Sequence, residues 1–398
     1  MYNLSNHYEN IYQHLQSIIA DPRVIYLYPF GSTQPENIEF LIDNRDPPDE
    51  RIPFQRRGPL FIFVDQEPLD FAYNKLLFDY IVSNVRGPYI LVNTEQRSEE
   101  KDRICNHYGF AQVDYFFHIF AAADWYRGHE YLPGIVAPAN RNLRKSYISF
   151  NRLTSNQRVY RSLLVNELYK RDVLKHGHVS LSKICPDGGA FDTNLTNSMG
   201  VLGINQELVT EACTNINSIP ELRIDFEDSE FIPNQSMLLS PLPKLMESFI
   251  FVVTETCYWQ DKTHLTEKIF KPIALQMPFI LVGCVNNLAY LRSYGFKTFG
   301  DYWDESYDTI ADPISRLTAI ADILKDISNL SASEQKTMLL DMQPILEHNL
   351  QLFTNPNFIH NEWQHLIDSL NNISQYYKFV APYTLDTKTG QSIPGVWQ

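Results

Sequence analysis

The chain has 398 residues and a formal net charge of -14, and 44% of its residues are hydrophobic. This length exceeds that of one ordinary domain, so we expect two or three domains, each with a full core. The acidic balance argues against a protein that holds nucleic acid along an extended surface, because such binding depends on lysine and arginine side chains that neutralise phosphates.

The cysteine spacing, the N-terminal segment and the lengths of the apolar runs limit the kinds of site and the cellular location that we expect. The five cysteines are scattered without CxxC spacing, which predicts neither a zinc site nor a disulfide framework. Residues 1–23 are typical of an amphipathic helix and carry no basic segment followed by an apolar core, so no secretory leader is expected. No apolar run approaches the roughly 18 to 20 residues that span a bilayer. We therefore expect a cytoplasmic protein without a membrane span.

In the first half, short apolar runs alternate with segments of helical periodicity. Strands are predicted at 24–30, 60–67, 89–95 and 113–120. The segment between the second and third strands has apolar residues at helical spacing, which indicates a strand-helix-strand unit. Such units build an open parallel sheet.

The same pattern starts again after a segment at 131–145 that contains two prolines and is the expected linker. Strands are predicted at 146–151, 178–182, 248–255 and 278–283, and helices at 156–174 and 266–276. The fold class is therefore α/β, with two Rossmann-like, doubly wound domains. Because such sheets bind ligands beyond the carboxyl ends of their strands, functional residues are sought there.

From residue 310 onward, the apolar spacing predicts helices at 310–330, 331–353 and 358–377. Asp312 and Pro313 would cap the first of these helices. We expect these helices to pack on the second domain. The predicted domains are residues 1–140 and 141–378, followed by a tail at 379–398.

Two acidic residues lie at the end of the second predicted strand. Strand alternation would place Asp65 and Glu67 on one face. A carboxylate at a strand end is suited to act as a general base on a hydroxyl. Alternatively, Glu67 is merely the last polar residue before a turn, or caps the helix that follows.

Two arginines begin the helix after the strand at 146–151. Arg158 and Arg161 are three residues apart, near the positive end of that helix, where an anion is favoured. With Arg152 close by, at least one of these side chains is a candidate phosphate ligand. A solvated helix face is the alternative.

The strand at 248–255 ends on Glu255, and Thr266, Glu267 and Lys268 begin the next predicted helix. Backbone amides at a helix start, together with a lysine, can hold a diphosphate without a metal. The sequence has no D-x-D pair in this region, so metal dependence is not implied. An ordinary helix start with a threonine cap would produce the same triplet.

Residues 248–283 resemble the nucleotide-sugar motif of the α1,3-fucosyltransferase family, F-x-F-E-N-S, then D-Y-V-T-E-K, then P-V-x-x-G. Glu255 stands at the glutamate of E-N-S, and Thr266 to Lys268 match T-E-K. The chain departs from the motif at Thr256, which replaces the asparagine, and at His264 and Leu265, which replace the tyrosine and valine.

Other parts of the chain are similar to further family motifs. Asn151 matches the asparagine of a strand that ends in S-N, and Arg161 matches the arginine that follows it. The sequence QEPLDF is similar to the family's E-S-P-x-F and places Glu67 at the position of the proposed catalytic base.

The resemblance implies a GT-B glycosyltransferase that inverts the sugar carbon without a metal. The C-terminal domain would bind a GDP or UDP sugar, with fucose as one candidate, and the N-terminal domain would bind a glycan or another hydroxyl acceptor. Glu67 would be the catalytic base, and Asp65 is the second candidate for this role.

The other site residues would serve the donor. Lys268 and Arg161 would stabilise the departing diphosphate, Glu267 would bond ribose or sugar hydroxyls, and Glu255 would orient the donor. Two alternatives stay open: a transferase of the same fold that glycosylates a nucleic-acid base, and a non-catalytic binding protein.

Overall fold

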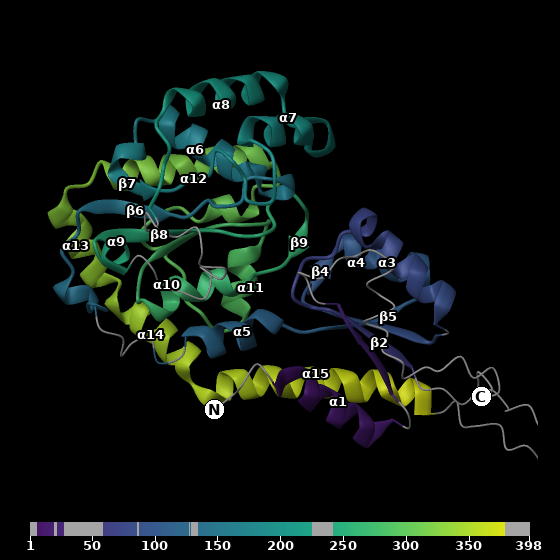
Figure 1. The fold of residues 1–398 in the computed structure, drawn as a ribbon. Coiled ribbons are helices and arrows are strands. Elements are labelled where there is room, and N and C mark those ends of the chain that lie inside the picture. Colours follow the sequence, from purple (N-terminus) through teal and green to yellow (C-terminus); the bar gives the residue numbers. More distant parts are fainter. Residues whose placement is uncertain are drawn as a thin grey trace, which may run out of the picture. The chain divides into compact units, whose positions relative to one another are not determined.

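The computed structural model describes residues 6–19, 22–27, 59–85, 87–126, 128, 134–224 and 242–378 (Figure 1). The described residues form two compact units. Unit 1 contains those up to Phe117 together with those from Ile359 onward, and unit 2 is His118–Phe358.

Unit 1 is built on four parallel strands in the order β1-β2-β3-β5. Their bounds are Arg23–Tyr26, Leu60–Val64, Tyr89–Asn93 and Ala111–Asp114. All five residues of β2 are buried, as expected for a strand covered on both faces. The chain visits the strands in the order in which they lie, so the connections run in one direction across the sheet.

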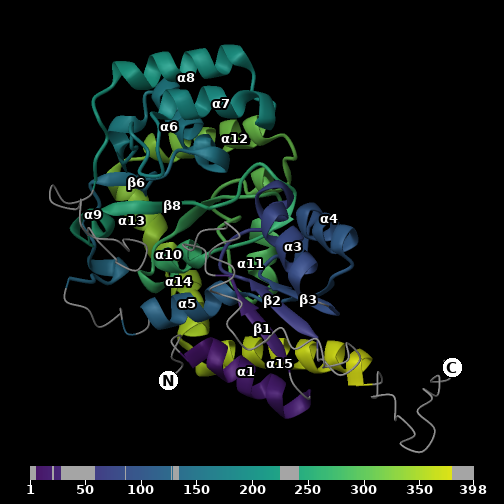
Figure 2. The same cartoon turned by 45° about the vertical axis from the view of Figure 1, so that its right-hand side comes forward.

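The helices of unit 1 cover both faces of this sheet. They are α1 (His7–Ile18), α3 (Phe71–Asn84), α4 (Glu99–Tyr108) and most of α15 (Pro356–Lys378), with a short strand β4 (Arg97–Ser98) before α4. Helices α3 and α4 lie on one face, and α1 and α15 on the other (Figures 1 and 2). The core between the sheet and α3 includes Ile62, Phe78 and Leu91.

Unit 2 has a second parallel sheet, in the order β10-β8-β6-β7. The bounds along the chain are β6 (Lys145–Ser149), β7 (Gly177–Val179), β8 (Ser248–Thr254) and β10 (Phe279–Val282), with a short β9 (Lys262–Thr263). All seven residues of β8 and all four of β10 are buried. These two strands contribute only buried residues to the unit 2 core.

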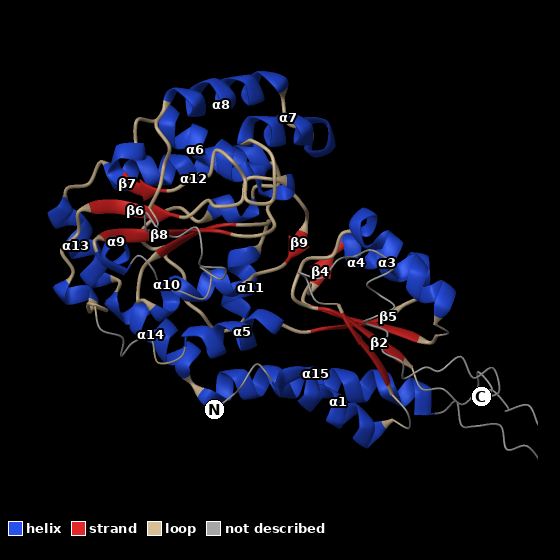
Figure 3. Cartoon of the chain, in the orientation of Figure 1, coloured by secondary structure: helices blue, strands red, loops and turns tan. Residues whose placement is uncertain are grey.

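Helices enclose this sheet, as the colouring by secondary structure shows (Figure 3). They are α5 (Phe117–Tyr126), α6 (Tyr160–Lys170), α7 (Phe191–Leu202), α8 (Gln206–Ser218), α9 (Leu242–Met246), α10 (Phe270–Ala274), α11 (Asn287–Ser293), α12 (Pro313–Ser328), α13 (Ala332–Asp341) and α14 (Gln343–Thr354). Helices α6 and α12 cover one face and α10 and α14 the other, with α8 outside α6 (Figures 1 and 2).

The α/β class with parallel sheets is confirmed, and each predicted strand overlaps an observed one. The strand predicted at 113–120 is wrong beyond Asp114, because Phe117 begins helix α5. Its sequence is mostly apolar and largely buried, and periodicity alone does not separate a buried strand from a buried helix. Residues 28–30 of the first predicted strand lie outside the described residues.

Two predicted helices are interrupted. The helix expected at 266–276 is a 3-10 turn, Glu267–Ile269, followed by the short α10, which ends before Pro278. The helix expected at 331–353 is divided into α13 and α14 at Met342. Pro344 explains this division, since proline lacks the amide hydrogen and collides with the preceding turn.

The chain passes between the units at Phe117/His118 and again at Phe358/Ile359, whereas the expected boundary was 140/141. Helix α15 beyond Phe358 thus belongs to unit 1, not to the second domain where we expected it. The tail at 379–398 lies outside the described residues. Within the described part of the chain, no helix combines the length and apolar character needed to cross a membrane.

Candidate functional site

The order of strands in unit 2 marks the place for a ligand. From β6 the chain crosses to β7 on one side, and then returns to form β8 on the other side of β6. In open parallel sheets, ligands bind beyond the carboxyl ends of the strands at such a reversal. The loops after β6 and β8 are therefore the candidate site, and most of the predicted donor residues lie there.

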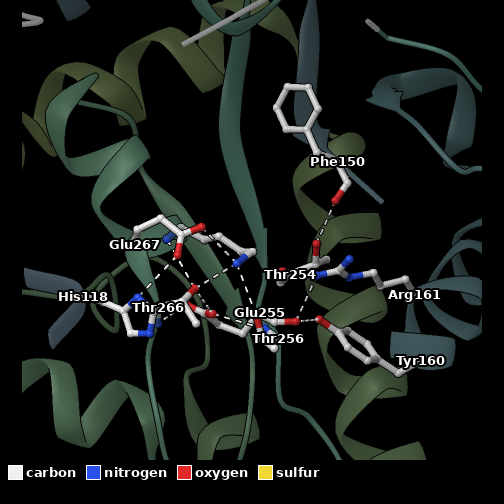
Figure 4. Close-up of polar contacts among 10 residues, drawn as sticks. His118, Phe150, Tyr160, Arg161, Thr254, Glu255, Thr256, Thr266 and Glu267 are labelled. Atoms are coloured by element: carbon white, nitrogen blue, oxygen red, sulfur yellow. Dashed lines mark hydrogen bonds and ion pairs between the residues drawn. The ribbon is translucent and has the colours of Figure 1, made fainter. Parts of the chain in front are cut away.

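The ends of β6 and β8 are tied together by hydrogen bonds. Thr254 Oγ1 donates to the carbonyl of Phe150 at 2.9 Å. The carbonyl of Glu255 accepts from the Tyr160 hydroxyl at 2.5 Å and from Arg161 Nη2 at 3.1 Å. Figure 4 shows Glu255 with Tyr160 and Arg161 on one side and Thr266 and Glu267 on the other. The backbone that carries Glu255 is held firmly in place.

The Glu255 carboxylate is fully buried and is bound by the threonine that begins the 3-10 turn. Thr266 Oγ1 donates to Glu255 Oε2 at 2.5 Å, and the Thr266 amide donates to Oε1 at 3.3 Å. Burial raises the pKa of Glu255, although the charge of Lys268 and the bonds from Thr266 oppose that rise. Glu255 thus orients Thr266 from within the protein.

Lys268 is the partly exposed charge of this group, with 30% of its side chain accessible. Its Nζ lies 3.2 Å from Thr256 Oγ1, 3.2 Å from Thr266 Oγ1 and 3.1 Å from Glu267 Oε1. Two of these three partners are neutral hydroxyls, which an anionic ligand could replace as partners of the ammonium group. We call Glu255, Thr266, Glu267 and Lys268 the charged cluster.

Glu267 is buried between a lysine and a histidine. Its Oε2 lies 3.6 Å from Nδ1 of His118, on α5. Burial alone would raise the pKa of Glu267, but Lys268, His118 and hydrogen bonds together lower it to about 2. Burial lowers the pKa of His118 to about 4, so this imidazole is neutral at physiological pH. Glu267 is therefore the permanent counter-charge of Lys268.

The other residues predicted to bind the nucleotide-sugar donor contact the rest of the protein. Arg161 is buried, and its Nη1 and Nη2 donate to the carbonyls of Leu153, Thr254 and Glu255. Arg158 precedes α6 in a separate 3-10 turn, half-buried, so the two arginines do not share one regular helix. A phosphate contact by either arginine stays a prediction.

Asn151 is also buried, at the end of β6. Its amide nitrogen donates to Ser149 Oγ at 3.0 Å, and its backbone N–H donates to Ser180 Oγ at 3.1 Å. It joins the loop after β6 to the segment after β7. Binding of the nucleotide sugar by Asn151 stays a prediction.

The two carboxylates proposed as base lie in unit 1, beyond the end of β2 at Val64, so strand alternation does not place them on one face. Asp65 is 1% exposed and accepts hydrogen bonds from the hydroxyls of Tyr8 and Tyr115. Burial raises its pKa to about 6, while the two tyrosine bonds act in the opposite direction. Of the two carboxylates, half-buried Glu67 is the more accessible.

The turn that carries Glu67 is fixed by a residue that the sequence did not single out. Glu95 follows β3, is fully buried, and accepts from the Leu69 amide at 2.8 Å through Oε1. Asp65 is bound at the other end of the same turn. Glu95 was not predicted as a site residue, although it too ends a predicted strand, and His118 was not predicted because it was assigned to a strand.

No group of three or more histidine, cysteine, aspartate or glutamate side chains in the described part of the chain is arranged to hold a metal ion. The charged cluster offers one ammonium group, two carboxylates and one threonine hydroxyl. These are groups that bind anions and hydroxyls. Lys268 can contact a phosphate, and Glu267 can accept from a hydroxyl.

Neither a protein-family model nor a curated protein sequence matches this chain. Among solved structures, α,α-trehalose 6-phosphate synthase from Burkholderia multivorans is similar at 13% identity and a TM-score of 0.38, covering 95% of this chain and 79% of that one. A UDP-forming α,α-trehalose-phosphate synthase from Burkholderia xenovorans is similar at 13% identity and a TM-score of 0.38, covering 94% and 80%.

Spinosyn rhamnosyltransferase SpnG is similar at 12% identity and a TM-score of 0.25, covering 75% of this chain and 72% of that one. Similarities at this level transfer neither a fold family nor an activity. The resemblance of residues 248–283 to the α1,3-fucosyltransferase family, and the GT-B arrangement that it implies, stay predictions.

Proposed function

We propose that this protein is an inverting, metal-independent glycosyltransferase that uses a nucleotide-diphosphate sugar. The observation that carries the proposal is the charged cluster, which lies after β8, beside the reversal of strand order where parallel sheets bind their ligands. The match of Thr266 to Lys268 with the T-E-K motif also supports binding of a nucleotide sugar.

In this proposal Lys268 binds the donor diphosphate and stabilises the charge that grows on it as the sugar leaves. Glu267 stays ionised and accepts from ribose or sugar hydroxyls, and Glu255 holds Thr266 and the turn in place. The sugar passes to an acceptor hydroxyl in a single displacement. Glu67 takes the proton of that hydroxyl, and the nucleoside diphosphate is released.

The assay of this function is the release of nucleoside diphosphate from GDP-fucose and UDP-glucose in the presence of EDTA, with glycan acceptors added in turn. We expect release by the wild-type protein and a loss of at least about a hundredfold in Glu67→Gln, the magnitude typical of a general base. The donor should still bind to this variant. Full activity of Glu67→Gln would remove Glu67 from the mechanism. Binding without turnover of any donor would favour the non-catalytic alternative.

A further inference from the structure

Two fully buried side chains beside the charged cluster carry polar atoms without hydrogen-bond partners in the described part of the chain. They are His264, with both ring nitrogens unpaired, and Asn287, with its Oδ1 unpaired. Buried polar groups are nearly always hydrogen-bonded, and each exception calls for an explanation such as a ligand or an ordered water.

The two side chains are neighbours of each other and of the cluster. Asn287 Nδ2 donates to the backbone carbonyl of His264 at 2.9 Å. A Cβ atom on Gly283 would lie 2.9 Å from Asn287 Nδ2 and 3.6 Å from Cγ of Glu255, so Asn287 and Glu255 flank the same glycine. The His264 ring lies 5.6 Å from that of His118, which contacts Glu267.

The unpaired atoms specify the chemistry of a partner. Burial holds the pKa of His264 well below its usual value, so the ring is neutral and offers one donor and one acceptor. Asn287 Oδ1 is an acceptor only. An ionised phosphate has no donor for that oxygen, whereas hydroxyl groups both donate and accept and so satisfy the ring and the amide together.

We propose that His264 and Asn287 form the subsite for the sugar of the donor, while Lys268 binds its diphosphate. This inference rests on the proposed function and divides the donor between two neighbouring groups of residues. Enclosure of the subsite would keep water away from the reacting sugar carbon and so limit hydrolysis. Because the side chains of His264 and Asn287 are both buried, the sugar can reach them only if the backbone around these two residues moves. The association rate of the sugar conjugate should therefore be lower than that of the free diphosphate.

The experiment compares two ligands on the same variants by isothermal titration calorimetry. The probes are GDP with GDP-fucose and UDP with UDP-glucose, applied to the wild-type protein, His264→Phe and Asn287→Ala. We expect the wild type to bind one sugar conjugate more tightly than its free diphosphate. Each variant should weaken that conjugate about tenfold, or about 1.4 kcal/mol, and change diphosphate affinity by less than about twofold.

Asn166→Ala is the matched control. Asn166 is an equally buried asparagine on α6, but both of its amide atoms are paired, with Glu211 and with Asn215. This control should lower the melting temperature without changing the ratio of the two affinities. If His264→Phe does not fold, Asn287→Ala carries the test.

The sugar subsite is overturned if the variants lose affinity equally for the diphosphate and the conjugate, or if the wild type does not prefer the conjugate. The diphosphate site would remain in either case. That result would assign the unpaired atoms to an ordered water. If the wild type binds none of the four probes, neither a GDP sugar nor a UDP sugar is its donor, and this inference fails together with that form of the proposed function.

Discussion

Thr266 is the residue that couples Glu255 to Lys268 within the charged cluster. Its hydroxyl donates to Glu255 and lies 3.2 Å from the ammonium group of Lys268, so one side chain orients both. Thr266→Val keeps the shape but leaves the buried Glu255 without its shortest hydrogen bond. We expect unit 2 to lose about 1 to 3 kcal/mol of stability, measured by urea unfolding. Thr266→Ser should recover most of that loss, and equal stability of all three proteins would contradict the coupling.

Glu255 should couple donor binding to proton uptake. Its pKa is already raised by burial, and a bound diphosphate would raise it further by adding negative charge nearby. Affinity for a nucleotide sugar, whose two phosphate charges are constant near neutral pH, should therefore increase as the pH falls, by at most about tenfold per pH unit. Calorimetry in buffers of different ionisation enthalpy should detect the proton. The pH dependence should be absent in Glu255→Gln, and its persistence there would point to another group.

His118 should make the stability of unit 2 depend on pH. Its pKa is lowered from 6.5 to about 4 in the folded protein, so the folded state binds fewer protons than the unfolded chain between these values. The contribution of His118 is fully present above pH 6.5 and is lost as the pH falls toward 4. Unfolding free energies from pH 7.5 to 4.5 should fall less steeply in His118→Gln. An unchanged slope would show that His118 is not held neutral.

The residues of the charged cluster could be selected from the sequence because each follows a strand or begins a helix, and their contacts with one another are observed. Glu255, Thr266, Glu267 and Lys268 come together as their spacing indicates. His264 could not be predicted, since its role depends on the lack of partners for its ring. That lack is a property of the packed structure and has no signature in the sequence.

Among the helices, one capping signal correctly located the start of an element. Asp312 caps α12 by accepting from the Ser315 amide, with Pro313 in the first turn, as predicted. Strand positions were also predictable, because short apolar runs of β-branched and aromatic residues suit buried parallel strands. The helix α5 was missed since its apolar sequence carries no periodicity, and the break between α13 and α14 was missed although Pro344 marks it.

Helix α13 offers a direct test of capping. Ser331 and Glu334 form a reciprocal capping box, in which Ser331 Oγ accepts from the Glu334 amide and Glu334 Oε2 accepts from the Ser331 amide. Ser331→Ala should cost about 1 kcal/mol of unfolding free energy. Ser333→Ala, an exposed change in the same turn, is the control and should be close to neutral. Equal effects of the two changes would show that the cap does not stabilise α13.

Two α/β domains were expected from the sequence, but not the points at which the chain passes between the two units. Helix α15 carries an amphipathic pattern, which shows that one face is buried but not on which unit. Its contacts decide this: Glu362 accepts from the Phe116 amide and Asn371 accepts from His14, both within unit 1. Contacts between residues so far apart in the chain are set by tertiary packing, which no local pattern records.

In the proposed function, unit 2 binds a nucleoside diphosphate through Lys268. The most direct measurement is the thermal melting of the wild-type protein with GDP, UDP, CDP, ADP and their sugars in EDTA, beside Lys268→Ala and the exposed control Lys325→Ala. A ligand at about a hundred times its dissociation constant should add about 2.7 kcal/mol, a shift of several degrees. We predict that one nucleotide series stabilises the wild type and Lys325→Ala but not Lys268→Ala. No shift with any nucleotide, or the same shift in all three proteins, would contradict the claim.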